Sequence, residues 1–153
     1  MAGDETGAEQ PLRTIELHLP SELGWERTAM DVAESVARRM GFPPERVEDI
    51  RTAVSEATTN AIEHGNALDA SKKVQIVLIP EGESLEIEIQ DRSATPFVPA
   101  ESGAAVPSVE DKMAGLSTTR GWGTFLIQSL VDEVEYSSTS RGNVVRMVIH
   151  LEP

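Results

Sequence analysis

The sequence contains no cysteine, and it has only half as many basic as acidic residues. The absence of cysteine excludes disulfides and thiolate metal sites, and it is compatible with a reducing compartment. No segment approaches the roughly 18 consecutive apolar residues needed to span a bilayer. The first residues also lack the basic and apolar regions of a secretory signal. We therefore expect a cytoplasmic protein that has no contact with a membrane.

The shortage of basic residues also bears on the ligand. With 13 basic against 26 acidic residues, the formal net charge is −13. Binding to nucleic acid requires clustered lysine and arginine, so this class of function is disfavoured. If the ligand is a nucleotide, its phosphates must be met mainly by Mg²⁺, by helix-end amides and by a few basic side chains. An equally good interpretation of the negative charge is that it only keeps the protein soluble and says nothing about a ligand.

The 153 residues correspond in length to one ordinary domain. Residues 1–11 are small, polar and acidic, and they indicate a disordered N-terminal tail. From residue 12 onward, apolar residues form periodic segments that are separated by glycine and proline, as in globular chains. We therefore expect a single domain over residues 12–153.

The first part of the domain reads as a strand followed by two helices. Residues 13–19 alternate apolar and polar side chains up to Pro20, which predicts a half-buried strand. Ser21 is expected to cap a helix that runs to about Met40 and stops at Gly41. Its expected buried members are Trp25, Met30, Val32, Ala33 and Val36. A second helix is expected from Pro43 and Pro44 to Gly65, with an apolar stripe of Val47, Ile50, Val54, Ala57 and Ala61.

The second part reads as a hairpin, a long loop, a helix and two more strands. Residues 73–79 and 85–91 predict two strands joined by a short turn. Residues 92–120 have no sustained period, whereas residues 121–134 resume helical spacing. Strands over 134–137 and 144–151 close the chain. This order predicts an α+β sandwich, with about three helices on one face of a mixed but mostly antiparallel sheet.

One helix face carries side chains that are capable of chemistry. Glu56 and Asn60 are four residues apart, and Glu63 and His64 follow one turn later. Without further evidence, these four residues indicate only a polar helix face that is exposed to solvent. An asparagine oxygen is nevertheless a suitable Mg²⁺ ligand, and a carboxylate one turn earlier could activate a hydroxyl nucleophile. His64 fits a packing or capping role at the helix end better than the role of a base.

Two further features lie later in the chain. Asp91 ends a predicted strand, where its carboxylate could accept a hydrogen bond from an exocyclic amine such as that of adenine, although an aspartate that starts a turn is at least as common. Gly121, Trp122 and Gly123 directly precede a predicted helix, where close backbone approach and free amides favour an anion. A flexible hinge explains the two glycines equally well. The order of these features, with a long loop between them, suits a ligand site with a lid.

Taken together, these motifs resemble the Bergerat ATP-binding fold shared by histidine kinases, Hsp90-type chaperones and type II topoisomerases. Within that superfamily the chain is most similar to the RsbW-type anti-sigma-factor serine kinases. The similarity is carried by SEATTNAIEHGN near residue 60, by GWGTFLIQSLVDEVEY from residue 121, and by its extent over residues 13–151.

The resemblance implies a set of roles for residues of this chain. Glu56 would be the general base, Asn60 would ligate Mg²⁺, Asp91 would recognise adenine, and residues 98–120 would form an ATP lid. The implied contacts to ATP or ADP are made by Asn60, His64, Gly65, Asp91, Ser93, Phe97, Arg120, Gly121, Trp122, Gly123, Thr124 and Asn143. The implied partners are a sigma factor, whose basic regions the acidic surface would complement, a serine-bearing anti-anti-sigma protein of the STAS type, and a second copy of the chain.

Three positions depart from the pattern of that family. Ser93 stands at a glycine of the middle motif, Val98 at its later aspartate, and Asn143 where a threonine often follows a glycine. A side chain where backbone should approach adenine would weaken nucleotide binding by about 1 kcal/mol.

These departures leave alternatives to the kinase open. A module that regulates by protein binding alone, with weak or no catalysis, is compatible with the altered motif. Retention of both Glu56 and Asn60 favours catalysis, because protein binding alone requires neither. A metal-dependent hydrolase that uses Glu56, Glu63 and His64 is a more distant alternative, since the sequence offers no second cluster of ligands.

Overall fold

The computed structural model describes residues 13–96 and 119–152, and for residues 119–122 it describes the backbone alone. Its strands are β2 (Ile15–Pro20), β3 (Lys73–Glu81), β4 (Ser84–Gln90), β5 (Glu133–Thr139) and β6 (Gly142–His150). Its helices are α1 (Glu26–Met40), α2 (Pro44–Asn60) and α4 (Thr119–Leu130), and the π-helical turn η1 (Ala61–Gly65) extends α2. The predicted order of elements is confirmed.

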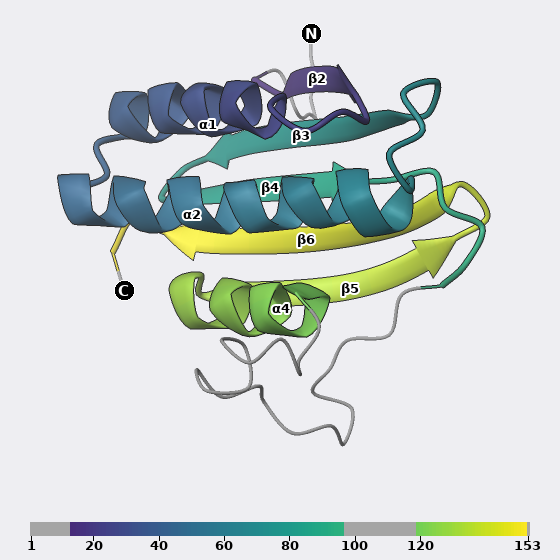
Figure 1. Cartoon of the computed structure of the whole chain (residues 1–153). Coiled ribbons are helices and arrows are strands. Elements are labelled where there is room, and N and C mark those ends of the chain that lie inside the picture. Colours follow the sequence, from purple (N-terminus) through teal and green to yellow (C-terminus); the bar gives the residue numbers. More distant parts are fainter. Residues whose placement is uncertain (1–12, 97–118, 153) are drawn as a thin grey trace, which may run out of the picture.

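The strands form one sheet in the order β2-β3-β4-β6-β5, and the three helices lie together on one of its faces (Figure 1). All four strand pairings are antiparallel. The expected mixed sheet is therefore wrong for the described strands, because each neighbouring pair runs in opposite directions. The α+β sandwich with helices on one face is confirmed.

The core lies between the sheet and the helices. Strands β3 and β4 alternate buried and partly exposed side chains, as their sequence period predicts. The stripe predicted for α2 is confirmed, since Val47, Ile50, Val54, Ala57 and Ala61 are all buried. No helix of the described residues is both long and apolar enough to cross a membrane.

The start of α1 differs from the prediction. The helix begins at Glu26, and its first turn has no side-chain cap. Ser21 is instead buried, and its hydroxyl donates to the carbonyl oxygen of Lys72 at 2.5 Å. Trp25 was expected inside, but it is exposed, because it precedes the helix in a connection that turns at Gly24 with φ 112°. The predicted stop is confirmed, since Gly41 has φ 97° and caps α1.

Asn66 joins three parts of the chain just after η1. Its side-chain amide nitrogen donates to Oγ of Ser21 at 2.9 Å and lies 3.2 Å and 3.3 Å from the carbonyl oxygens of Lys72 and Lys73. Its side-chain oxygen accepts from the backbone N–H of Arg92 at 2.7 Å. The side chain is buried, so these contacts replace water for both of its polar atoms.

Replacing Asn66 with alanine should therefore destabilise the fold strongly. The substitution leaves several buried polar groups without a partner, and one such loss costs about 1–3 kcal/mol. We expect the free energy of unfolding to fall by about 3 kcal/mol in urea titrations. Ser71→Ala, an exposed substitution in the same connection, should change it by less than about 0.5 kcal/mol. Equal stability of the two variants would contradict this role of Asn66.

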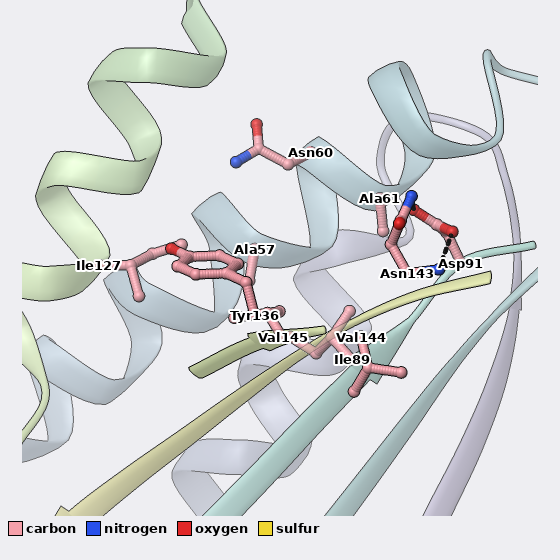
Figure 2. A pocket seen from close by; sticks show the side chains of 10 residues that line it. All are labelled: Ala57, Asn60, Ala61, Ile89, Asp91, Ile127, Tyr136, Asn143, Val144 and Val145. Carbon is pink, nitrogen blue, oxygen red and sulfur yellow. Dashed lines mark hydrogen bonds between the residues drawn. The ribbon is translucent and has the colours of Figure 1, made fainter. Parts of the chain in front are cut away.

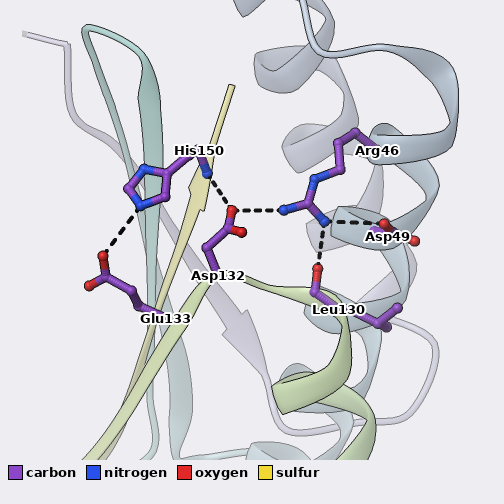
Figure 3. Close-up of polar contacts among 6 residues, drawn as sticks. All are labelled: Arg46, Asp49, Leu130, Asp132, Glu133 and His150. Carbon is purple, nitrogen blue, oxygen red and sulfur yellow. Dashed lines mark hydrogen bonds and ion pairs between the residues drawn. The ribbon is translucent and has the colours of Figure 1, made fainter. Parts of the chain in front are cut away.

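Arg46 fixes the C-terminal end of α4 (Figure 3). One guanidinium nitrogen donates to the carbonyl oxygen of Leu130 at 2.8 Å and pairs with Asp49 at 3.2 Å. The other pairs with Asp132 at 2.7 Å, and the same carboxylate oxygen accepts from the backbone N–H of His150. The last turn of α4 is thereby held against α2 and β6.

Candidate functional site

The first part of the candidate site lies where α4 approaches α2. Glu56 and Asn60 are partly exposed and lie one turn apart on α2. A Cβ atom added to Gly123 would lie only 2.8 Å from Oε1 of Glu56 and 3.2 Å from Nδ2 of Asn60. A Cβ atom there would require the end of the Glu56 side chain to shift, so glycine leaves room for both side chains next to α4. The carboxylate, the amide and the first part of α4 are thus brought together.

Asn60 has an unusual feature for a helix side chain. Its Oδ1 atom is shielded from solvent and accepts no hydrogen bond within residues 13–96 and 119–152. A buried acceptor without a partner is costly, and in a native structure it indicates a missing ligand, water or ion. An amide oxygen is a ligand that Mg²⁺ accepts. The environment of Asn60 therefore fits the metal role implied for it.

The described residues contain no group of three histidine, aspartate or glutamate side chains that could hold a metal ion. A Mg²⁺ ion bound by one or two protein oxygens takes its remaining ligands from water and substrate phosphates. The geometry at Asn60 thus fits a metal that arrives with a phosphate-bearing ligand.

The second part of the site is the carboxylate of Asp91, which is buried where the chain leaves β4. Its Oδ1 accepts from the backbone N–H groups of Ser93 at 2.9 Å and Asn143 at 2.8 Å. A Cβ atom on Gly65 would overlap Oδ2 of this carboxylate, and one on Gly142 would overlap the carbonyl oxygen of Asp91. The backbone therefore packs directly around Asp91, which fixes the direction of the carboxylate.

Asn143 connects this carboxylate to β5 and to the residues after β4. Its Nδ2 donates to the carbonyl oxygen of Thr95 at 2.9 Å and lies 3.4 Å from Oδ2 of Asp91. Its Oδ1 accepts from the hydroxyl of Ser138 at 2.7 Å. The hydroxyl of Ser93 forms a small turn with Thr95. The two polar residues that depart from the family pattern thus engage neighbouring backbone.

A narrow cavity of about 40 Å³ lies between α2 and the sheet, and it reaches both parts of the site (Figure 2). Asn60 and Asp91 both line it, together with Ala57, Ala61, Ile89, Ile127, Tyr136, Asn143, Val144 and Val145. Ser93 is not among the lining residues. Pockets for drug-sized ligands usually measure about 300–1,000 Å³, so a whole purine requires the walls of this cavity to move apart.

The beginning of α4 differs from the prediction. Gly121, Trp122 and Gly123 were expected immediately before the helix, but α4 begins at Thr119. Only the first four amides of a helix lack an acceptor within it. Gly121 remains among these positions, whereas the amides of Gly123 and Thr124 lie beyond them. The expectation that the amides of Gly123 and Thr124 are free donors at the helix end is therefore wrong. The structure instead places Gly123 where α4 comes close to α2.

The remaining predicted site residues are distributed as follows. Thr124 is buried, and the exposed side chain of His64 lies 4.0 Å from a carboxylate oxygen of Glu63, at the surface of η1. The structure thus brings together Glu56, Asn60, Gly65, Asp91, Ser93, Gly123 and Asn143, in two parts joined by the cavity. Phe97, Val98 and the rest of the expected lid up to residue 118 lie outside the described residues, as do the side chains of Arg120 and Trp122.

Sequence reasoning missed Tyr136. Its ring lies between Ile127 of α4 and Ala57 of α2, inside the cavity wall (Figure 2). It occupies an inward position of β5 between the exposed Glu135 and Ser137. That alternation was a usable signal, because an aromatic residue at an inward strand position next to predicted ligand residues is a candidate for the pocket wall.

Comparisons with known proteins agree with this geometry. The family of the histidine kinase-like ATPase domain matches residues 19–149. The serine-protein kinase RsbW of Oceanobacillus iheyensis is 31% identical, over 81% of this chain and 78% of its own. An anti-sigma F factor of a Thermoanaerobacter species is 32% identical, over 90% of this chain and 93% of its own.

A solved structure supports the fold. It contains the RsbU and RsbW domains of a Mycobacterium tuberculosis protein and superposes with a TM-score of 0.63 over 93% of this chain, at 19% identity. This chain spans only 33% of the solved one, so the likeness concerns the architecture of one domain.

Proposed function

The chain belongs to the histidine kinase-like ATPase domain family, among the RsbW-type serine kinases and anti-sigma F factors, and we propose that it is a Mg-ATP-dependent protein serine kinase. One observation carries the proposal: the buried Oδ1 of Asn60 has no hydrogen-bond partner in the described part of the chain, and it lies next to a carboxylate and a glycine-containing helix. The relatives support the rest, since one is named a serine-protein kinase and another an anti-sigma F factor.

In this proposal, adenine enters the cavity with its exocyclic amine directed to the buried carboxylate of Asp91. The backbone N–H groups of Ser93 and Asn143 hold Oδ1, and Oδ2, which Nδ2 of Asn143 approaches to 3.4 Å, has a second lone pair to accept from the amine. Gly65 has no side chain to cover that oxygen. Asn60 would hold Mg²⁺, which neutralises charge on the phosphates when bound.

The proposed chemistry transfers the γ-phosphoryl group to a serine. A bond forms between the serine oxygen and the γ-phosphorus as the bond from the β,γ-bridging oxygen breaks, and ADP leaves. Glu56 accepts the proton of the serine hydroxyl. The backbone amides at the start of α4, including that of Gly121, form the positive end of the helix dipole. They therefore attract the negative charge of the phosphates.

Three partners follow from the proposal. We propose that the chain sequesters a sigma factor, that its substrate is a serine of a STAS-type anti-anti-sigma protein, and that it forms a homodimer. The face of the sheet away from the helices offers a surface for a second copy, since Val77 and Ile79 are partly exposed and alternate with the buried residues of β3, near the pair of Arg146 with Glu86 at 2.9 Å. A sedimentation mass of one chain at micromolar concentration would refute the dimer.

A second candidate is a partner-switching module with little or no catalysis. The small volume of the cavity favours it, because an adenine ring enters only after the walls move. A measurement of Mg-ATP binding distinguishes the kinase from the partner-switching module, since a module that acts by protein binding alone does not require the nucleotide.

Calorimetric titration of Mg-ATP into the wild type and Asn60→Ala tests the proposal. We expect at least about a hundredfold weaker binding by the variant, which corresponds to about 2.8 kcal/mol. The substitution should not harm stability, because it removes a buried acceptor that has no partner in the described residues. Thr52→Ala, an exposed substitution on the same helix, is the control and should bind like wild type. Equal binding by Asn60→Ala would remove this residue from the metal site.

A further inference from the structure

Tyr136 has the largest side chain in the wall of the cavity between α2 and the sheet. It is also the only tyrosine of the chain. Figure 2 shows its ring at one end of the cavity, with Ala57 and Ile127, and it shows Asp91 and Asn143 at the other end. The two ends therefore differ in chemistry, since one offers a buried carboxylate and the other an aromatic ring.

The length of the cavity determines how far a bound purine reaches. Ala57 and Ala61 form its wall along the helix, and a separation of four residues corresponds to a rise of about 6 Å. In Figure 2 Ala61 lies at the end with Asp91, and Ala57 lies at the end with Tyr136. The two fused rings of a purine are rigid and extend over about the same length. A purine whose amine faces Asp91 therefore meets the ring of Tyr136 with its far edge.

Most of the cavity wall is held in place. Ala57 and Ala61 have no side-chain torsion that could make room. Asp91 and Asn143 are fixed by hydrogen bonds to each other and to neighbouring residues. Ile127 is buried in α4. The remaining branched residues belong to β4 and β6, which are paired on both sides, and branched side chains are stiff: Ile89, Val144 and Val145.

Tyr136 differs from this fixed wall. It belongs to β5, the edge strand of the sheet, which is paired with β6 alone. Its side chain is partly exposed, and its ring moves as one body when the first side-chain torsion changes from one staggered position to another. Such a rotation carries the ring out from between α2 and α4 along the open edge of the sheet. It breaks no hydrogen bond between β5 and β6, so Tyr136 is the part of the wall that moves most easily.

We propose that Tyr136 is the gate of the nucleotide site. In the free protein its ring occupies the place of the far edge of the purine, and it turns out past the edge of β5 when the nucleotide binds. The inference rests on the proposed function, which makes the purine of Mg-ATP the ligand of the cavity. The gate sets the affinity of the site, because apparent affinity falls with the fraction of molecules in which the site is open.

Tyr136→Val removes the gate. Valine suits a position in an edge strand, and its side chain ends before the place of the ring. Calorimetric titration should therefore show at least about tenfold tighter binding of Mg-ATP than in the wild type, because the site no longer has to open. Tyr136→Phe is the matched control. It retains the ring, so it should bind Mg-ATP like the wild type.

The wild type reports the movement of the ring directly. Because Tyr136 is the only tyrosine, protein labelled with fluorotyrosine carries its fluorine at this residue alone. Saturation with Mg-ATP should shift the fluorine resonance towards its position in the urea-unfolded protein, since the ring gains contact with water. Tripolyphosphate with Mg²⁺ is the control ligand, because it has no base to displace the ring, and it should leave the resonance in place.

Four results separate the gate from the proposed function. Weaker binding of Mg-ATP by Tyr136→Val would show that the ring supports the base, and it would overturn the gate. Equal affinity of this variant and the wild type, or a fluorine resonance that Mg-ATP does not shift, would overturn the gate and leave the kinase intact. Binding by Tyr136→Val alone would support the gate and refute the kinase activity of the wild type. If neither protein binds Mg-ATP, the proposed function fails, and the gate fails with it.

Discussion

Glu56→Gln should slow phosphoryl transfer by a factor of about 10² to 10⁴, the usual contribution of a general base. Glutamine has the same shape as glutamate but does not accept a proton at neutral pH. Glu56 touches no nucleotide atom in the proposed arrangement, so Mg-ATP affinity should change by less than about threefold. The packing should survive, because the position occupied by Oε1, close to Gly123, remains filled.

Single-turnover transfer of the γ-phosphoryl group to the protein substrate measures this effect without interference from product release. Glu63→Gln is the matched control, since it makes the same change about two turns later on α2 and η1, next to His64. The Glu63→Gln variant should transfer the γ-phosphoryl group at the rate of the wild type. Equal loss in both variants would indicate a general effect of charge, and wild-type rates in Glu56→Gln would show that another group takes the proton.

Most of the fold could be predicted because local patterns and tertiary packing agree. The apolar stripe of α2 has the helical period and is buried as a whole. Strands β3 and β4 alternate as their sequence does, and the turn between them contains Gly82 at φ 61°. Gly41 ends α1 for the reason the sequence suggests, since only glycine adopts φ 97° without strain.

The errors arose where a distant contact outweighed a local preference. Ser21 has the composition of a helix cap, but its hydroxyl serves the carbonyl of Lys72, which is 51 residues later. Trp25 reads as a core residue by hydrophobicity alone, whereas its indole is held outside by Glu22. The start of α4 was placed at its glycines because glycine disfavours helix. The approach of Gly123 to Glu56 and Asn60 explains how a glycine is accommodated there.

Only part of the candidate site could be predicted from the sequence, because local patterns do not encode contacts between distant residues. Glu56 and Asn60 are close in sequence, so helical spacing placed them together. The contacts of Asp91 with Gly65 and Asn143 join residues from three elements, and no local pattern encodes them. The resemblance to a family supplied these three residues but not their contacts, and Tyr136, which was assigned no role, was missed.

Asp91→Asn should change which nucleotide is bound. The carboxylate of Asp91 accepts hydrogen bonds, and its backbone donors at Ser93 and Asn143 require an oxygen at the Oδ1 position. In the variant the amide nitrogen must then occupy the Oδ2 position, where it faces both the amine of adenine and Nδ2 of Asn143 donor to donor. A site built to hydrogen-bond a polar group discriminates against a mismatched one by about 10⁴ or more. We expect Mg-ATP affinity to fall at least about a hundredfold.

The same substitution should favour a purine with a carbonyl group at position 6, because the new amide nitrogen can donate to it. Competition between ATP and ITP distinguishes a changed base preference from general damage to the pocket. The ratio of the two affinities should shift towards ITP by at least about tenfold. Unchanged affinities for both nucleotides would mean that Asp91 does not face the base. A large drop in melting temperature would instead indicate that its role is to hold Ser93 and Asn143, and the adenine assignment would then have to move to another acceptor.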